Sequence, residues 1–311
     1  MEKCAFLFAG QGSQYAGMGK DLYESFPESK GVFDKAEAVL GFELKKVCFE
    51  GPPEQLKATD VSQPAIVAAS IAAFEAFKAR VDIVPAYVAG LSLGEYSALI
   101  ASGSLTLEDG LRLIKRRGQI MEEAARKYPG KMAAVIELAL EKIKESCRES
   151  GAEIANLNCP GQTVITGKAE AVLSAAGLCE KAGAKRVIAL EVSGGFHSSL
   201  MSEASLELKK ELESVDFSRP VVPLVGNYDA KPQQDAAAIR DNLVYQIKSS
   251  VRWEESMRFL LSQGVTTFYE FGPGKVLKGL MRRIDSNVKV VTIEKKSDVL
   301  SAGCGGGQDG S

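Results

Sequence analysis

Short apolar runs alternate with longer helical stretches over most of the chain. Runs that predict buried strands lie at residues 5–9, 86–89, 221–225, 267–271 and 288–293. Residues 64–77 form an apolar stretch long enough for a buried helix, and a further helix is predicted to follow Gly94 and to run through Ala101. Strands separated by helices predict an α/β fold whose parallel sheet is covered on both faces.

The middle of the chain has a different order of predicted strands and helices. The pattern predicts a strand at 132–138, a helix at 140–150, strands at 153–157 and 162–167, a helix at 170–182 and a strand at 186–192. This β-α-β-β-α-β order is that of a ferredoxin-like unit. We therefore expect a core of residues 1–126 and 194–300, interrupted by a ferredoxin-like subdomain at 127–193. The glycine-rich tail, 301–311, is predicted to be disordered.

Composition and charge narrow the class of protein. Of the 311 residues, 45% are hydrophobic and 25% are charged, which is typical of a globular protein. The 38 basic and 40 acidic residues give a net charge of −2, so no nucleic-acid partner is expected. No apolar run is as long as a membrane span, and the first is shorter than the apolar region of a signal peptide. We expect a soluble, cytoplasmic protein with no membrane partner.

The cysteines and the histidine limit the chemistry further. The six cysteines are scattered without a C-x-x-C spacing, which indicates reduced thiols rather than a disulfide framework. The chain has one histidine, His197. A site that needs two imidazoles, such as an H-E-x-x-H zinc site, is therefore excluded, and no metal is expected.

Residues 90–94, Gly-Leu-Ser-Leu-Gly, fit the pattern G-x-S-x-G. In a nucleophile elbow, the glycines permit a sharp turn from strand to helix that exposes the serine above the sheet. The predicted strand before Ser92 and the predicted helix after it favour this interpretation over an ordinary glycine-rich turn. The N–H group of Leu93 would then face a developing oxyanion at the start of a helix.

A serine needs a base to take its proton before it is a good nucleophile. His197 is the candidate by elimination, and it follows a predicted strand in a glycine-rich loop. A lone histidine can also be a structural residue. Its position, 105 residues after Ser92 and 114 before the end, differs from that of standard hydrolases, in which the histidine lies late in the chain.

Arg117 lies on the inward face of a predicted helix. Apolar residues recur there at helical spacing, at Leu107, Leu111, Ile114 and Met121. A buried guanidinium keeps its charge and needs an anionic partner. That partner is either an internal carboxylate in a structural ion pair or the carboxylate of a substrate, which the planar fork can bind with two hydrogen bonds.

The loop of residues 10–14, Gly-Gln-Gly-Ser-Gln, follows the first predicted strand. It fits neither G-x-x-x-x-G-K-[ST] nor G-x-G-x-x-G, so nucleotide binding is not indicated. Its position at the carboxyl end of a strand suits a second oxyanion donor opposite Leu93, and a plain turn is the alternative.

Taken together, these motifs resemble the malonyl-CoA:acyl carrier protein transacylases of fatty-acid synthesis and the acyltransferase domains of polyketide synthases. The resemblance extends from about Phe6 to Ile293. It rests on an ordered series of segments, namely residues 8–14, 63–65, 90–97, 117–118, 158–162, 195–198, 251–257 and 271–277.

The resemblance implies a function and a role for each site residue. Ser92 would carry the malonyl group and His197 would be its base. The backbone N–H groups of Gln11 and Leu93 would form the oxyanion hole, and Arg117 would bind the malonyl carboxylate. Gln246 matches the position whose carbonyl orients the histidine in place of a triad acid.

The same resemblance implies an α/β-hydrolase-like core with a ferredoxin-like insert. The enzyme would move a malonyl group from malonyl-CoA to the phosphopantetheine thiol of acyl carrier protein by a ping-pong route. Malonyl-CoA and acyl carrier protein are then the partners, no cofactor is needed because the CoA thioester is a substrate, and we expect a monomer. One departure concerns Leu91, where many members of the family have histidine.

Two other functions are compatible with parts of this pattern. A serine esterase or thioesterase of the α/β-hydrolase type would use the same elbow and base, although the inward arginine and the place of His197 weigh against it. A catalytically silent module that binds carrier protein would have no need of both Ser92 and His197.

Overall fold

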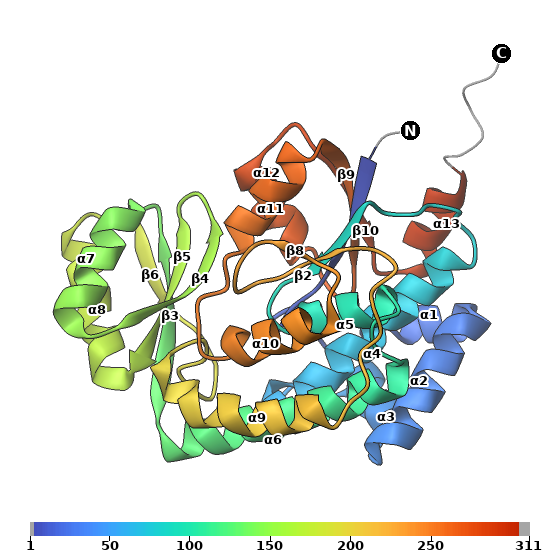
Figure 1. Ribbon diagram of the computed structural model, residues 1–311, viewed down its shortest axis with the longest axis horizontal. Coiled ribbons are helices and arrows are strands. Elements are labelled where there is room, and N and C mark those ends of the chain that lie inside the picture. The colour runs from blue at the N-terminus through green and yellow to red at the C-terminus, as the bar shows by residue number, and fades with distance from the viewer. Residues whose placement is uncertain (1–2, 305–311) are drawn as a thin grey trace.

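The larger of two sheets lies at the centre of the computed structural model, which describes residues 3–304. Its spatial order is β10–β9–β1–β2–β7–β8, and every pair of neighbours is parallel except β7 and β8. The parallel sheet expected from the sequence is thus confirmed (Figure 1). The strands are β1 (Lys3–Phe8), β2 (Tyr87–Gly90), β7 (Leu224–Val225), β8 (Pro232–Gln233), β9 (Val265–Phe271) and β10 (Lys289–Ile293).

One strand of this sheet is shorter than predicted. The apolar run at 221–225 gives only the two-residue strand β7, because Pro220 and Pro223 have no N–H groups for a ladder. The antiparallel strand β8 has no apolar pattern and is not predicted from the sequence.

Both faces of the sheet are buried, as the sequence predicts. Side chains of a strand alternate between its two faces, and in β1 Phe6 and Phe8 join one apolar core while Ala5 and Leu7 join a second. The first core includes the long helices α4 (Thr59–Lys78) and α6 (Leu107–Lys127), and the second includes α11 (Trp253–Ser262) and α12 (Val276–Ile284). These two layers hold the carboxyl ends of β1 and β2 in fixed positions.

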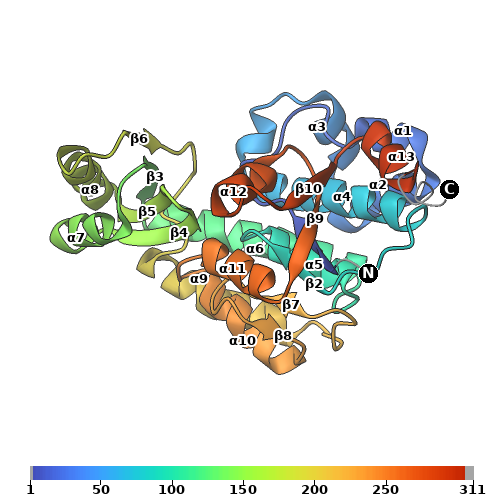
Figure 2. The same ribbon diagram turned by 90° about the horizontal axis from the view of Figure 1, so that it is seen from above.

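The helices of the core surround this sheet (Figures 1 and 2). Their bounds are α1 (Lys20–Ser25), α2 (Pro27–Leu40), α3 (Leu44–Glu50), α4 (Thr59–Lys78), α5 (Gly94–Ala101), α6 (Leu107–Lys127), α9 (Ser202–Glu213), α10 (Ala236–Gln246), α11 (Trp253–Ser262), α12 (Val276–Ile284) and α13 (Lys296–Cys304). Two short 3-10 helices are η1 (Gln55–Lys57) and η2 (Ser199–Met201).

A second, antiparallel sheet lies beside the core, with α7 and α8 packed against it (Figure 2). Its order is β4–β5–β3–β6. The six predicted elements of this segment are all present, as β3 (Gly130–Ile136), α7 (Leu140–Ser150), β4 (Glu153–Cys159), β5 (Gln162–Lys168), α8 (Ala169–Lys181) and β6 (Arg186–Ala189).

The C-terminal end of the described chain corrects one prediction. A disordered tail was expected from residue 301, but residues 301–304 belong to α13. The buried Val299 anchors this helix to the larger core, which the glycine-rich composition does not reveal. Residues 305–311 of the predicted tail lie outside the described residues. In the described part of the chain, no helix combines the length and the apolar character that a membrane span requires.

Candidate active site

The turn between β2 and α5 presents Ser92. β2 ends at Gly90 and α5 begins at Gly94, so only three residues separate strand from helix. A Cβ atom on Gly90 would lie 2.0 Å from the carbonyl carbon of Gly94, and one on Gly94 would lie 2.2 Å from the carbonyl oxygen of Phe8. Ser92 has a φ of +50°, a strained value for a residue with a side chain. The predicted nucleophile elbow is therefore present in its geometry.

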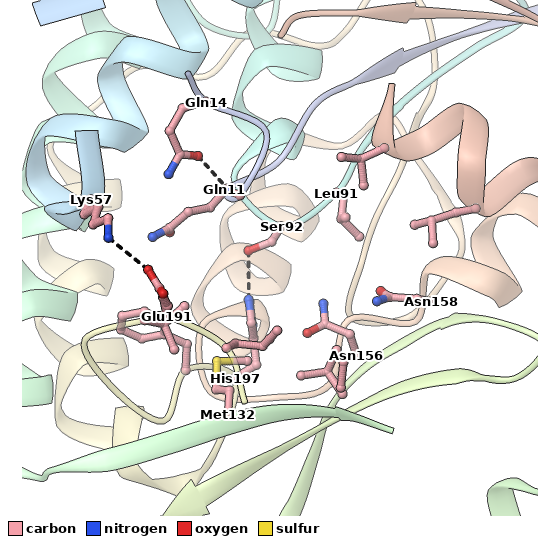
Figure 3. A pocket seen from close by; sticks show the side chains of 18 of the residues that line it. Gln11, Gln14, Lys57, Leu91, Ser92, Met132, Asn156, Asn158, Glu191 and His197 are labelled. Carbon is pink, nitrogen blue, oxygen red and sulfur yellow. Dashed lines mark hydrogen bonds and ion pairs between the residues drawn. The ribbon is translucent and has the colours of Figure 1, made fainter. Parts of the chain in front are cut away.

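His197 lies directly beside Ser92. Its Nε2 is 2.8 Å from Ser92 Oγ (Figure 3). Its Nδ1 is 2.8 Å from the carbonyl oxygen of Gln246. A carbonyl oxygen can only accept, so Nδ1 carries the proton and Nε2 has the free lone pair. Ser92 therefore donates its hydroxyl proton to Nε2, which is the arrangement that a general base requires.

The environment keeps this imidazole neutral. His197 is buried, and the loss of hydration together with the nearby charge of Arg117 lowers its pKa from 6.5 to about 4. At neutral pH the ring can therefore take a proton. The loop that carries it is held by β5, since Thr166 Oγ1 donates a hydrogen bond of 2.8 Å to the carbonyl oxygen of Phe196.

Arg117 is fully buried in the middle of α6, as its spacing predicts. Its Nη1 donates to Gln63 Oε1 at 2.8 Å, and its Nη2 donates to Gln246 Oε1 at 3.2 Å and lies 3.4 Å from Ser92 Oγ. Within residues 3–304 the guanidinium has no ion pair with a carboxylate, so the structural ion pair considered from the sequence is not observed. A buried cation next to a candidate nucleophile is available for an anionic substrate group.

The loop after β1 approaches the same turn. Leu91 N donates to the carbonyl oxygen of Phe8 at 3.2 Å, which brings Gln11 to the side of Ser92. The N–H groups of Gln11 and Leu93 take part in none of the backbone hydrogen bonds that fix these two turns. Both lie next to Ser92, where donors for an oxyanion are required.

A cavity of about 570 Å³ lies above Ser92, between the two sheets. The core contributes Gln11, Leu91 and Ser92, and the antiparallel sheet contributes Asn156 and Asn158 to the opposite wall (Figure 3). Lys57 and Glu191 also line this cavity and form an ion pair of 2.9 Å. Arg117 is buried and is not among the residues that line the cavity, although its Nη2 lies 3.4 Å from Ser92 Oγ.

Comparison with known protein families agrees with this geometry. The model of the acyl transferase domain family matches residues 5–295, which is nearly the whole chain. The chain belongs to the acyl transferase domain family. It is therefore an acyltransferase.

Relatives of this acyl transferase domain are similar over almost their full length. The malonyl CoA-acyl carrier protein transacylase of Bacillus subtilis (strain 168) is 45% identical over 298 residues, which cover 94% of each chain. The Escherichia coli (strain K12) protein of the same name is 40% identical over 306 residues, covering 97% of this chain and 99% of that one.

Solved structures of similar proteins share the fold. A chain from a complex of a type II PKS acyl-carrier protein with its malonyl-transacylase superposes with a TM-score of 0.94 at 39% identity, covering 97% of this chain and 99% of that one. An acyl carrier protein S-malonyltransferase from Vibrio cholerae gives a TM-score of 0.93 at 39% identity, covering 96% and 99%.

The sequence predicts no role for three buried polar side chains of this acyl transferase domain, Gln63, Glu95 and Asn227. Gln63 bonds to Arg117, as described above, and Asn227 Oδ1 accepts the N–H group of Ser92 at 2.6 Å. Asn227 lies two residues after β7, which pairs with β2. A polar residue just beyond the carboxyl end of a neighbouring strand is the signal that could have indicated it.

Proposed function

We propose that this acyltransferase moves a malonyl group from malonyl-CoA to the phosphopantetheine thiol of acyl carrier protein. The observation that carries the proposal is the 2.8 Å contact of Ser92 Oγ with His197 Nε2, with the buried Arg117 guanidinium 3.4 Å from the same oxygen. The relatives named above are malonyl CoA-acyl carrier protein transacylases, and one similar structure contains an acyl-carrier protein.

In the first half-reaction Ser92 Oγ attacks the thioester carbonyl while His197 Nε2 takes the hydroxyl proton. The N–H groups of Gln11 and Leu93 receive the oxyanion. The C–S bond then breaks, and the CoA thiolate leaves with the proton from His197. In the second half-reaction the carrier thiol gives its proton to His197 and attacks the ester, and Ser92 Oγ leaves and regains the proton.

Arg117 gives the reaction its preference for a dicarboxylic acyl group. Its two terminal nitrogens donate to the amide oxygens of Gln63 and Gln246, so within residues 3–304 the guanidinium has polar partners but no carboxylate in direct contact. The free carboxylate of a malonyl group bound to Ser92 would supply a negative charge and accept two hydrogen bonds from the guanidinium. The esterase or thioesterase alternative offers no use for such a cation and is not favoured.

We also propose the finer description of the fold. The parallel sheet with its nucleophile elbow suits an α/β-hydrolase-like core made of residues 1–126 and 194–300, and the order β4–β5–β3–β6 suits a ferredoxin-like subdomain at 127–193. The monomeric state and the absence of a cofactor stay predictions from the sequence.

Mapping of the acyl-enzyme tests this function. After incubation with malonyl-CoA and rapid acid quenching, mass spectrometry is expected to find one malonyl group on the peptide that contains Ser92. Ser92→Ala is the matched control and should carry none. A malonyl group on another residue, or none in the wild type, would contradict the proposal. Transfer of the label to added holo-acyl carrier protein would support the second half-reaction.

The pH dependence of acylation tests the base. Since His197 must be neutral to take a proton, the rate should fall as pH falls through its pKa of about 4. We expect a nearly constant rate from neutral pH to about pH 5 in pH-jump, single-turnover measurements with malonyl-CoA. An acid limb at the ordinary histidine value of 6.5 that persists in Glu95→Gln, which lacks the buried carboxyl of pKa about 7 beside the site, would contradict the buried, neutral imidazole.

A further inference from the structure

Glu95 is a buried carboxylate that the proposed chemistry does not use. It lies in the first turn of α5, three residues after Ser92, and only 1% of its surface is exposed. Burial raises its pKa to about 7, while its bonds to Gln246 and Asn227 and the charge of Arg117 act in the opposite direction. A buried carboxyl group is costly unless its oxygens are hydrogen-bonded, so its partners show what it stabilises.

One oxygen of Glu95 joins two separate parts of the site. Oε2 accepts the Nε2–H of Gln246 at 2.8 Å and the backbone N–H of Asn227 at 3.1 Å. Gln246 is the last residue of α10, and Asn227 follows β7. This single oxygen of α5 therefore links the end of α10 to the segment that follows β7.

These two partners are hydrogen-bonded to the reactive pair, Gln246 to both members and Asn227 to Ser92. The carbonyl oxygen of Gln246 accepts from His197 Nδ1 at 2.8 Å, and its side chain also donates to the carbonyl oxygen of Ser92 at 2.9 Å. The side chain of Asn227 accepts from Ser92 N at 2.6 Å and donates to the carbonyl oxygen of Gly90 at 2.8 Å. The carboxyl group of Glu95 is thus two hydrogen bonds away from both Ser92 and His197.

We propose that Glu95 is a positioning residue of the acyl transfer, whose Oε2 sets the place of His197 through Gln246 and of the strained Ser92 turn through Asn227. It does not touch the substrate. A displacement of about 1 Å between reacting groups can lower a rate by about 10²-fold, so an anchor shared by nucleophile and base has a large effect on their alignment. The inference rests on the proposed roles of Ser92 and His197.

The test replaces Glu95 by residues of similar size that either lack or keep a hydrogen-bond acceptor. Glu95→Met removes both hydrogen bonds, whereas Glu95→Gln retains a side-chain oxygen that can accept them. The readout is the maximal rate at which a fluorophosphonate probe modifies Ser92, with loss of fluoride, followed by mass spectrometry. This probe needs no malonyl group, no CoA and no carrier protein.

We expect Glu95→Met to lower the maximal modification rate about 10- to 100-fold with little change in the probe concentration at half-maximal rate. Glu95→Gln should stay within about threefold of the wild type, because the acceptor is kept. Glu270→Met is the matched control: Glu270 is also 1% exposed and accepts two backbone N–H groups, those of Leu277 and Lys278, in α12. It should lower thermal stability but leave the maximal rate of the folded protein near that of the wild type.

The outcomes separate this inference from the proposed function. Equal losses in Glu95→Met and Glu270→Met, or an equal loss in Glu95→Gln and Glu95→Met, would overturn the positioning role. An absence of Ser92 modification in the wild type would contradict the proposed nucleophile and this inference with it. Wild-type modification that Glu95→Met does not slow would overturn this inference alone.

Discussion

Replacing His197 by alanine is expected to lower the rate of Ser92 acylation by malonyl-CoA by about 10²- to 10⁴-fold, the usual contribution of a general base. His197 Nε2 is the group that accepts the Ser92 hydroxyl. The chain has no other histidine, so no second imidazole can take over. Leu91, the residue before the nucleophile, has an apolar side chain and cannot exchange a proton. Single-turnover quenched-flow measurements with radiolabelled malonyl-CoA would give the rate.

Loss of folding must be separated from loss of the base. The substitution removes a buried ring, so some loss of stability is expected, and the fraction of folded protein should be measured by thermal unfolding in the same buffer. A folded His197→Ala variant that acylates within about tenfold of the wild type would exclude His197 as the general base.

Replacing Arg117 by alanine is expected to change the choice of acyl group. Hydrogen bonds to charged groups contribute about 1.5–3 kcal/mol, so malonyl transfer should fall by about 10- to 100-fold. Acetyl-CoA has no second carboxylate, and its transfer should stay the same or rise because an uncompensated buried cation is removed. The ratio of kcat/KM for malonyl-CoA and acetyl-CoA measures the change.

The neighbouring Arg116 provides the control for this change in acyl-group preference. Arg116 is exposed on the same helix and forms an ion pair of 3.0 Å with Glu211, so Arg116→Ala should leave both transfers unchanged. Arg117→Lys keeps the charge but loses the planar fork, and it should recover only part of the malonyl transfer. Equal losses of malonyl and acetyl transfer in Arg117→Ala would instead indicate a structural arginine.

Local pattern was sufficient for much of the site. Gly90 and Gly94 allow backbone segments to approach more closely than a Cβ atom would permit. The Ser92 turn could therefore be predicted from the five-residue motif at 90–94. The inward position of Arg117 follows from helical spacing alone. The six elements of the antiparallel sheet segment were also predictable, because each has its own period of apolar positions.

Other parts were not predictable because they depend on residues that meet only in three dimensions. The carbonyl of Gln246 was assigned by family resemblance, since every residue has a carbonyl and none is distinctive in a sequence. The roles of Glu95 and Asn227 arise from hydrogen bonds between residues more than 130 positions apart. The helix at 301–304 depends on the packing of Val299 against the core, which composition does not indicate.

The sequence by itself determined the order of strands and helices, the nucleophile turn, the inward arginine and the identity of the only possible imidazole. Only the tertiary structure decided that Ser92 and His197, 105 residues apart, lie at 2.8 Å, and that Arg117 has amide partners instead of a carboxylate. The reason is the distance along the chain over which each effect acts. Periodicity and turn chemistry act over a few residues, whereas proton transfer and pKa depend on distances and burial that the packing of the whole chain sets.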